Sequence, residues 1–232
     1  LQMENVYLFM RMQRWQGRIA SSTNRIWPCY SPFISRFNLE TSIQIDNGTR
    51  KYNHLLRLAL EKYNIDVNGL VCADIGASTG GFTDCLLQHG AKKVYAIDVG
   101  YGQLDVKLRN DSRVVMMEKV NARYLTADDI PEKMDLVTID VSFISLKLIL
   151  PVAKEILKEH GQLVALVKPQ FEAGRKEIGK GGVVKSIEVR EAVLQDISTF
   201  TQSSSFKIHG TMESPVHGPA GNIEYLLWGE KE

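Results

Sequence analysis

A glycine-rich stretch of the sequence carries residue types that could hold a nucleotide-like cofactor. It reads ADIGASTGGFTD over residues 73–84, with small hydroxyl residues between its glycines. The glycines would let the backbone pass close to a ligand without a clash from Cβ, and the amides that open a following helix would face the same ligand. The cofactor-binding residues predicted here are Asp74, Gly76, Ser78, Thr79, Gly80 and Gly81.

A second acidic position lies at the end of the next apolar run. Asp98 closes the run KVYAID over residues 93–98 and is followed by Val99. In a nucleotide-binding α/β sheet, an acidic residue at this point is placed to accept hydrogen bonds from ribose hydroxyls. The sequence therefore predicts that Asp98 and Val99 border the ribose of the cofactor.

The spacing of the glycines separates two classes of cofactor. The dinucleotide fingerprint is Gly-x-Gly-x-x-Gly, whereas this chain has Gly76-x-x-x-Gly80-Gly81 after an acidic Asp74. A carboxylate near the turn suits the ammonium group of S-adenosylmethionine, and no pyrophosphate has to be bound. The pattern favours a methyltransferase, with a nicotinamide-dependent enzyme and a non-catalytic Rossmann-like domain as the alternatives.

Three further charged residues lie at the ends of later apolar runs: Asp140, Lys168 and Glu224. The carboxyl ends of parallel strands meet at one crevice, so Asp140 and Lys168 should lie together over the cofactor. Glu224 opens its run and reaches that crevice only if the last strand is antiparallel. Two carboxylates favour the charged form of a lysine, although a partly desolvated amine could accept a proton or stabilise a developing alkoxide. The alternative is that each residue belongs to a separate surface ion pair.

The elements that must position these residues alternate along the chain from residue 54 onward. A helical pattern begins at residue 54, and strands that alternate with helices indicate a mostly parallel, doubly wound sheet covered on both faces. The predicted fold class is α/β, a Rossmann-like domain over residues 50–232 with seven strands. We expect strands at 70–74, 93–98, 114–118, 135–140, 162–167, 206–212 and 224–228, and helices near 81–89, 102–108, 146–158 and 187–203.

The composition fits a globular protein with a sizeable core. Of the 232 residues, 44% are hydrophobic and 24% are charged, which excludes a fully disordered chain, a collagen-like fibre and a disulfide scaffold. The three cysteines are scattered, no Cys/His set has zinc-ligand spacing, and Cys72 is expected in the core. No metal site is expected. No apolar run approaches the roughly 18–20 residues that cross a bilayer, so stable membrane insertion is not expected.

Positive charge is concentrated at the start of the chain. Residues 1–57 contain eight Arg and Lys residues against three Asp and Glu residues. We interpret residues 1–49 as a weakly structured basic leader, which suits an RNA-binding arm or a transit peptide. Two other basic clusters could supply phosphate contacts or be ordinary solvated surface: Arg109, Arg113, Lys119 and Arg123, and then Arg175, Lys176, Lys180 and Lys185 around the Gly-rich loop 179–182.

Five motifs, taken together, resemble the hemolysin A (TlyA) family, which is similar to FtsJ-type RNA methyltransferases. They span about residues 55–228 and read DIGASTGGFTD, DVGYGQL, DVSFISL, LVKPQFEAG and GNIE. The resemblance implies a class I methyltransferase fold and S-adenosylmethionine-dependent 2′-O-methylation of ribosomal RNA, typically at cytidine. It also implies a Lys-Asp-Lys-Glu catalytic tetrad.

Carried onto this sequence, the resemblance places Asp140, Lys168 and Glu224 on three tetrad positions. It also places Asp140 at the cofactor and Asn121 beside the adenine, although a turn-forming Asn is an equal alternative. The first tetrad lysine has no match, because Leu55 stands at its position, and Lys51 or Arg57 could substitute for it from another turn of the helix. The family's amino-terminal S4 RNA-binding module is not recognisable in residues 1–49.

The expected function is therefore methyl transfer from S-adenosylmethionine to ribosomal RNA, free or within ribosomal subunits. Two alternatives stay open: a cofactor-binding protein that does not transfer methyl groups, and a membrane-active hemolysin. The sequence has no strongly amphipathic segment to favour the second. The expected location is the cytoplasm, or an organelle if the leader is a transit peptide.

Overall fold

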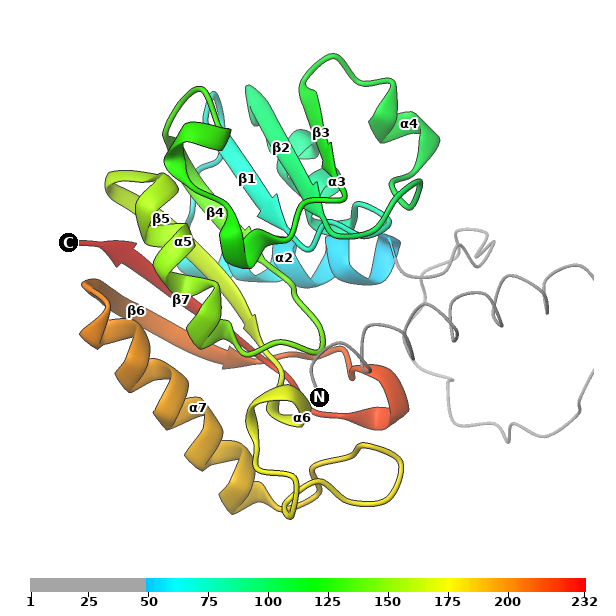
Figure 1. The fold of residues 1–232 in the computed structure, drawn as a ribbon, viewed down its shortest axis with the longest axis vertical. Coiled ribbons are helices and arrows are strands. Elements are labelled where there is room, and N and C mark those ends of the chain that lie inside the picture. The colour runs from blue at the N-terminus through cyan, green and yellow to red at the C-terminus, as the bar shows by residue number, and fades with distance from the viewer. Residues whose placement is uncertain (1–48) are drawn as a thin grey trace, which may run out of the picture. The chain divides into compact units, whose positions relative to one another are not determined.

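The computed structural model describes residues 49–232, which form one seven-stranded sheet with helices on both faces (Figure 1). The strands are β1 (Val71–Ile75), β2 (Lys93–Asp98), β3 (Val114–Glu118), β4 (Met134–Ile139), β5 (Leu157–Val167), β6 (Phe206–Glu213) and β7 (Tyr225–Lys231). Their order is β3-β2-β1-β4-β5-β7-β6. The first five are parallel, and β7 is antiparallel to β5 and β6. The predicted α/β class and mostly parallel sheet are confirmed.

An α-helix separates most consecutive strands, as the sequence predicts, whereas 3-10 helices alone join β3 to β4 and β6 to β7. The α-helices are α2 (Thr49–Tyr63), α3 (Gly81–Gln88), α4 (Val106–Arg109), α5 (Leu150–Ile156), α6 (Pro169–Glu172) and α7 (Ile187–Ser203). Residues 49–232 also contain four short 3-10 helices in the connections: η1 (Ala122–Tyr124), η2 (Ala127–Asp129), η3 (Leu146–Leu148) and η4 (Pro219–Gly221). The predicted leader, residues 1–49, lies outside the described residues except for Thr49, which begins α2.

The sheet separates two hydrophobic cores. Side chains of α2, α3 and α4 pack on one face, and side chains of α5 and α7 pack on the other. Successive residues of a strand point to opposite faces, so Cys72 joins the first core and Ala73 the second. Cys72 is fully buried, which confirms its predicted place in the core.

Two predicted helices are shorter than expected. The prediction of a helix near 146–158 was wrong at both ends, because η3 precedes α5 and residues 157–161 continue into β5, where Leu157 pairs with Met134. The helix near 102–108 is reduced to α4, because Gly102 has a left-handed backbone (φ +70°) and the side chain of Asp105 caps the helix at Lys107 N.

The strand order reverses between β1 and β4. The chain runs outward from β1 to β2 and β3 on one side, and from β4 to β5 on the other. Open α/β sheets bind ligands at the carboxyl ends of the two strands where this reversal occurs. We call this region, formed by residues 76–81 and 140–143, the switch-point edge. Within residues 49–232, no helix is both long and apolar enough to cross a bilayer.

Candidate functional site

The glycine turn packs directly against the end of β4. Gly76 has a left-handed backbone (φ +87°), and a Cβ added there would overlap the carbonyl oxygen of Asp140. Gly80 is also left-handed (φ +97°) and lies against the side chains of Leu104 and Leu108. Both positions therefore require glycine for conformation and for space. The turn brings the predicted cofactor-binding residues to the switch-point edge.

Asp74 lies beneath this turn and is almost completely buried, with 1% of its surface exposed. Its Oδ2 accepts hydrogen bonds from Thr83 N at 2.9 Å and from Thr83 Oγ1 at 2.7 Å, and its Oδ1 accepts one from Thr138 Oγ1 at 3.0 Å. Burial raises the pKa of Asp74 to about 7, against the lowering effect of these donors. In this structure its oxygens anchor the start of α3, and direct contact with a ligand ammonium stays a prediction.

The free energy of unfolding is expected to fall between pH 5 and pH 8, and Asp74→Asn is expected to make this fall smaller. The folded protein keeps a proton on Asp74 up to a pKa of about 7, above the ordinary value of 3.8. The folded state therefore binds more protons than the unfolded state between about pH 4 and pH 7, so the free energy of unfolding falls as pH rises, by up to a few kcal/mol. Asparagine does not titrate. Denaturant unfolding of both proteins at the two pH values measures the difference.

The matched control for this test is Asp111→Asn. Arg113 lowers the pKa of Asp111 to about 2 through its hydrogen bonds, so this carboxylate is charged in both folded and unfolded states over the tested range. Its removal should leave the change between pH 5 and pH 8 as it is in the unmodified chain. If the free energy of unfolding of the Asp74 variant falls as much between pH 5 and pH 8 as that of the unmodified chain, Asp74 does not cause the fall.

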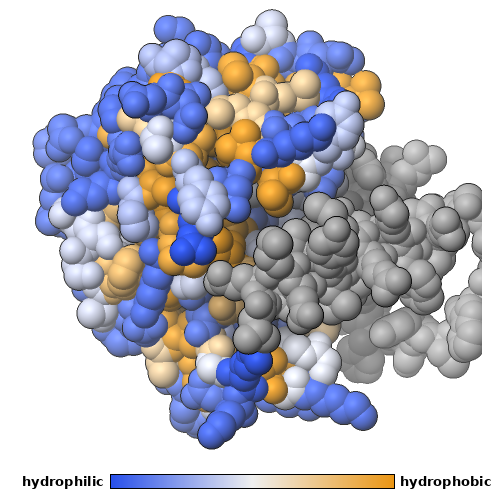
Figure 2. All heavy atoms as spheres, viewed as in Figure 1, coloured by the Kyte–Doolittle hydropathy of each residue, from blue (hydrophilic) through white to orange (hydrophobic). Residues whose placement is uncertain are grey.

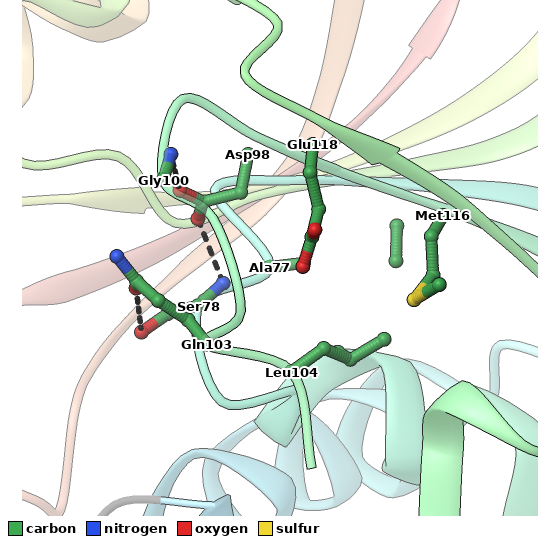
Figure 3. Close-up of a pocket in the computed structure, with 9 residues that line it drawn as sticks. Ala77, Ser78, Asp98, Gly100, Gln103, Leu104, Met116 and Glu118 are labelled. Carbon is green, nitrogen blue, oxygen red and sulfur yellow. Dashed lines mark hydrogen bonds between the residues drawn. The ribbon is translucent and has the colours of Figure 1, made fainter. Parts of the chain in front are cut away.

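A pocket opens beside the turn, at the carboxyl ends of β2 and β3 (Figure 3). Asp98 joins its two sides, because its Oδ2 accepts from Ser78 N at 2.8 Å and its Oδ1 accepts from Gly100 N at 2.6 Å. Glu118 lies across the pocket and accepts from Gly102 N at 2.9 Å. The residues that line the pocket are Ala77, Ser78, Ala96, Asp98, Gly100, Gln103, Leu104, Met116 and Glu118.

The lining of this pocket suits a nucleoside without phosphates. Leu104 and Met116 offer apolar side chains to a flat ring, whereas Asp98 and Glu118 place two carboxylates at the wall. Both carboxylates can accept hydrogen bonds from hydroxyl groups, and Asp98 repels phosphates, whereas the charge of Glu118 is paired with Arg109. The chemistry of the lining therefore suits the adenosine part of S-adenosylmethionine better than the pyrophosphate of a dinucleotide.

Some predicted cofactor residues lie near the pocket without lining it. Val99 is 58% exposed on the loop after β2, and Thr79 accepts a backbone bond from Asp105 N at 3.2 Å. Asn121 is exposed and caps η1, where its side chain accepts from Arg123 N at 3.1 Å. The structure thus gives Asn121 a turn-forming role, and its contact with adenine stays a prediction.

Lys168 and Asp140 meet at the switch-point edge, as the sequence predicts. Their side chains form an ion pair and are 7% and 15% exposed. Lys168 Nζ also donates to Ser142 Oγ at 3.1 Å. The alternative of separate surface ion pairs is wrong for these two residues, because both are largely withdrawn from solvent and paired with each other.

Glu224 lies beside them because β7 is antiparallel to β5. Tyr225 pairs with Val167, so Glu224 stands level with Lys168 at the same edge. Glu224 is 1% exposed, and its Oε1 accepts a hydrogen bond from Gln170 Nε2 at 2.8 Å. From the sequence, Glu224 reaches this edge only if the last strand is antiparallel, and β7 is antiparallel. Gln170, which sequence reasoning missed, is thus a buried partner of a predicted catalytic carboxylate.

Helix α2 contributes Tyr52 rather than Leu55 to this region. Leu55 is fully buried in the core between α2 and the sheet. Tyr52, about one turn earlier, packs edge-on against Phe82 with ring centroids 6.4 Å apart. Burial, and then the nearby carboxylates of Asp140 and Glu224, raise the pKa of Tyr52 above its ordinary value. Among the described side chains of α2, from residue 52 onward, the neutral phenol of Tyr52 therefore lies near these two carboxylates.

An exposed aromatic residue directly follows Ser142, the hydrogen-bond partner of Lys168, in the chain. Phe143 is 60% exposed and has a left-handed backbone (φ +64°), a conformation that is costly for a bulky residue. Its ring lies against that of Phe171, with centroids 4.8 Å apart. The sequence motif DVSFISL by itself assigns no role to this phenylalanine. An exposed ring in a strained conformation is a candidate surface for stacking.

In the first predicted basic cluster, the two arginines Arg109 and Arg113 form ion pairs within the protein. Arg109 forms an ion pair with Glu118, and Arg113 with Asp111 at 2.7 Å. These pairs direct both guanidinium groups toward carboxylates of the protein. The two arginines are therefore poor candidates for phosphate contacts.

The other two cations of this cluster face exposed aromatic rings. Lys119 Nζ lies 4.6 Å from the ring centroid of Tyr101, which is 71% exposed. The guanidinium of Arg123 lies 5.6 Å from the ring centroid of Tyr124. Cations beside exposed rings suit a nucleic acid, which offers both phosphates and stacking bases. In the described part of the chain, no three His, Cys, Asp or Glu side chains come together to hold a metal ion.

The chain is similar to known proteins over most of its length. Residues 55–231 match the model of a family described as FtsJ-like methyltransferase. The chain is 47% identical over 175 residues to the 16S/23S rRNA (cytidine-2′-O)-methyltransferase TlyA of Mycobacterium tuberculosis, a match that covers 75% of this chain and 65% of the relative. It is 46% identical over 172 residues to hemolysin A of Brachyspira hyodysenteriae, covering 74% and 72%. The chain thus spans less than two thirds of the mycobacterial relative.

Solved structures show the same fold. A protein described as a hemolysin from Streptococcus thermophilus matches with a TM-score of 0.78 and 46% identity, over 83% of this chain and 69% of that chain. An S-adenosylmethionine-dependent methyltransferase from Listeria monocytogenes matches with a TM-score of 0.58 and 19% identity, over 75% and 97%. At that identity the likeness concerns the fold alone, and it confirms the predicted class I methyltransferase architecture.

Proposed function

Because the chain belongs to the FtsJ-like methyltransferase family, we propose that it transfers a methyl group from S-adenosylmethionine to a ribose 2′-hydroxyl of ribosomal RNA, with cytidine as the target nucleotide. The observation that carries the proposal is the buried Lys168–Asp140 ion pair beside Glu224, at the edge where the glycine turn and the nucleoside pocket meet. The names of the TlyA relatives support the RNA substrate.

The cofactor proposal assigns each part of S-adenosylmethionine to residues that match it chemically. Asp98 takes the ribose hydroxyls, since each of its oxygens has a further lone pair beyond its bond to a backbone amide. The adenine lies between the apolar side chains of Leu104 and Met116, and the methionine part lies along the turn over residues 76–81. Bound there, the cofactor supplies a methyl group already activated on a sulfonium.

Asp98→Asn is expected to weaken S-adenosylmethionine binding by about tenfold or more. The variant loses the charge and one acceptor, and hydrogen bonds to charged groups contribute roughly 1.5–3 kcal/mol. Isothermal titration calorimetry measures the effect. Asp129→Asn is the matched control, because Asp129 also accepts a backbone bond, from Thr126 N at 2.8 Å, on a turn that does not line the pocket. Equal affinity in the two variants would remove Asp98 from the cofactor site.

In the proposed mechanism, Lys168 holds the ribose oxygen in line with the methyl group. Its ammonium, ion-paired with Asp140, stabilises negative charge on the 2′-oxygen as this oxygen takes the methyl group from sulfur and releases the hydroxyl proton to solvent. Ser142 and Asp140 fix the direction of Nζ, and Gln170 fixes Glu224 beside it. Because the methyl donor needs no further activation, alignment provides much of the acceleration.

Phe143→Ala is expected to raise the KM for RNA by about tenfold while leaving the affinity for S-adenosylmethionine unchanged. The exposed ring, next in the chain to the Ser142 partner of Lys168, is placed to stack on a nucleotide base, and such stacking contributes roughly 1–3 kcal/mol per base. Steady-state methylation at varied RNA concentration measures the KM. Phe143→Tyr, which keeps the ring, is the control. An unchanged KM in the alanine variant would contradict the stacking role.

The decisive experiment is transfer of radiolabelled methyl groups from S-adenosylmethionine to purified small and large ribosomal subunits and to the protein-free RNA of each. The proposal expects label in RNA, released after nuclease digestion as a 2′-O-methylated nucleoside. Label on a base, or label on protein alone, would overturn the 2′-O assignment. Cofactor binding without label in any substrate would favour the non-transferring alternative.

A further inference from the structure

We propose that the loop over residues 173–186 binds the phosphate backbone of the substrate RNA, and that Asn222 sets the position of this loop relative to Glu224. The proposal rests on the proposed function and extends it to a specific RNA-contacting surface. The loop leaves the site directly, because it follows α6, which itself follows Lys168. It projects from the body of the protein before α7 (Figure 1).

The loop carries a strong positive charge. Four basic side chains are exposed on it, against a single acidic residue, Glu177. Glu177 turns back on the loop and accepts from Gly174 N at 2.9 Å. The lower edge of the molecule in Figure 2, where the loop lies, is mainly hydrophilic. Single-stranded and folded RNA both offer closely spaced phosphates that complement such a surface. The basic residues are Arg175, Lys176, Lys180 and Lys185.

The tip of the loop has a defined shape that presents Lys180. Gly179 N donates to Val183 O at 2.9 Å, and Gly182 N donates to Gly179 O at 3.1 Å, which closes a tight turn. Gly181 has a left-handed backbone (φ +84°), as several turn types require at their third position. Lys180 therefore lies at the second position of the turn, exposed to solvent.

Asn222 clamps this tip to the segment that carries Glu224. Its Oδ1 accepts from Val184 N at 3.1 Å, and its Nδ2 donates to Gly182 O at 3.0 Å. Asn222 is 3% exposed and Val184 is 1% exposed, so the attachment is buried. Asn222 lies two positions before Glu224 in the chain. A loop held in this way loses less conformational freedom when it binds a partner than a free loop would.

The geometry thus connects phosphate binding to the reacting centre. RNA held on the loop is held at a fixed distance from Glu224, whose carboxylate is bonded to Gln170 next to the Lys168 segment. Asn222 is in this sense a positioning residue. It acts through the loop and through the backbone that precedes Glu224.

The test compares two triple variants of the full chain that remove the same charge. Lys176→Gln, Lys180→Gln and Lys185→Gln together neutralise the three lysines of the loop. The control changes three exposed lysines near the amino ends of the parallel strands, at the opposite edge of the sheet: Lys92→Gln, Lys133→Gln and Lys207→Gln. Binding to protein-free ribosomal RNA is measured by filter binding between about 0.05 and 0.2 M salt, a range over which binding through phosphates weakens steeply.

The loop variant is expected to bind RNA about tenfold or more weakly than the control. Its dependence of log K on log salt should be shallower by about one for each phosphate that the loop no longer binds. Its affinity for S-adenosylmethionine should not change. Equal RNA affinity and equal salt dependence in the two variants would overturn the proposal, even if the unmodified chain methylates RNA. RNA binding that depends on the loop, without methyl transfer, would contradict the proposed function while supporting the loop.

The clamp is tested by Asn222→Ala, which leaves the charge unchanged. If the clamp positions the loop, the single-turnover rate of methyl transfer at saturating RNA falls by about tenfold, whereas RNA affinity changes less than in the loop variant. An unchanged rate, or a loss confined to RNA affinity, would overturn the positioning role of Asn222. A thermal unfolding curve for each variant shows whether the fold is retained.

Discussion

Lys168→Met is expected to lower the rate of methyl transfer by about 1000-fold or more while S-adenosylmethionine still binds. The side chain keeps its length and loses its charge, so nothing remains to hold the ribose oxygen or stabilise its developing negative charge. Groups that act in this way contribute typically 10²–10⁴ in rate. Single-turnover transfer to ribosomal RNA measures the rate, and calorimetry measures cofactor affinity.

This variant also perturbs stability, and a second variant separates the two effects. Removing one partner of a largely buried ion pair leaves Asp140 without its counter-charge, which costs roughly 3–5 kcal/mol. The double variant Lys168→Met with Asp140→Asn removes both charges and should recover most of this stability without recovering transfer. Recovery of transfer along with stability would mean that Lys168 supports the fold and not the reaction.

The surface ion pair of Lys147 provides the matched control. Lys147 Nζ lies 2.7 Å from Asp196, with 36% and 60% of the two side chains exposed. Exposed pairs contribute about 0–1 kcal/mol, so Lys147→Met should change neither transfer nor stability appreciably. Comparable losses in both lysine variants would show that the effect at Lys168 is not specific to the site.

The elements of the sheet could be predicted from the sequence because each central strand is buried on both faces. β1 has no exposed residue, so its sequence is a short apolar run bounded by turn residues. The boundary between α5 and β5 could not be predicted in the same way. It depends on the pairing of Leu157 with Met134, a contact between strands that no local pattern encodes.

The charged residues of the site were predictable for a related reason. Asp98, Asp140 and Lys168 each lie at the end of an apolar run, and in a parallel sheet such residues gather at one edge. Glu224 depended on the direction of β7, which the sequence leaves open. Its position followed only once the antiparallel pairing with β5 was known.

The supporting residues of the site could not be predicted, because their roles arise from packing. Tyr52 reaches the region of Asp140 and Glu224 only because α2 lies across the sheet, with Leu55 turned into the core. Gln170 and Asn222 look like ordinary loop and turn residues in the sequence. Each acquires a role through a buried hydrogen bond to a distant segment.

Gly76→Ala is expected to lose both cofactor binding and methyl transfer, and to destabilise the fold. A methyl group here would overlap the carbonyl oxygen of Asp140, which is backbone and cannot rotate away. The left-handed backbone (φ +87°) adds strain of about 1–2 kcal/mol for any L-residue. Overlap in a well-packed place adds roughly 1–3 kcal/mol more. Relief of the overlap requires the turn or the end of β4 to move, and either movement separates the cofactor from Lys168.

Gly69→Ala is the control that separates the effect of steric overlap at Gly76 from the effect of backbone strain. Gly69 is also left-handed (φ +76°), but a Cβ added there meets nothing within 4 Å. This variant should lose only the conformational part of the stability, about 1–2 kcal/mol, and should bind S-adenosylmethionine normally. Denaturant unfolding and calorimetry on both variants measure the difference. If the two variants lose equal stability and both still bind the cofactor, the packing of the glycine turn on Asp140 does not position the site.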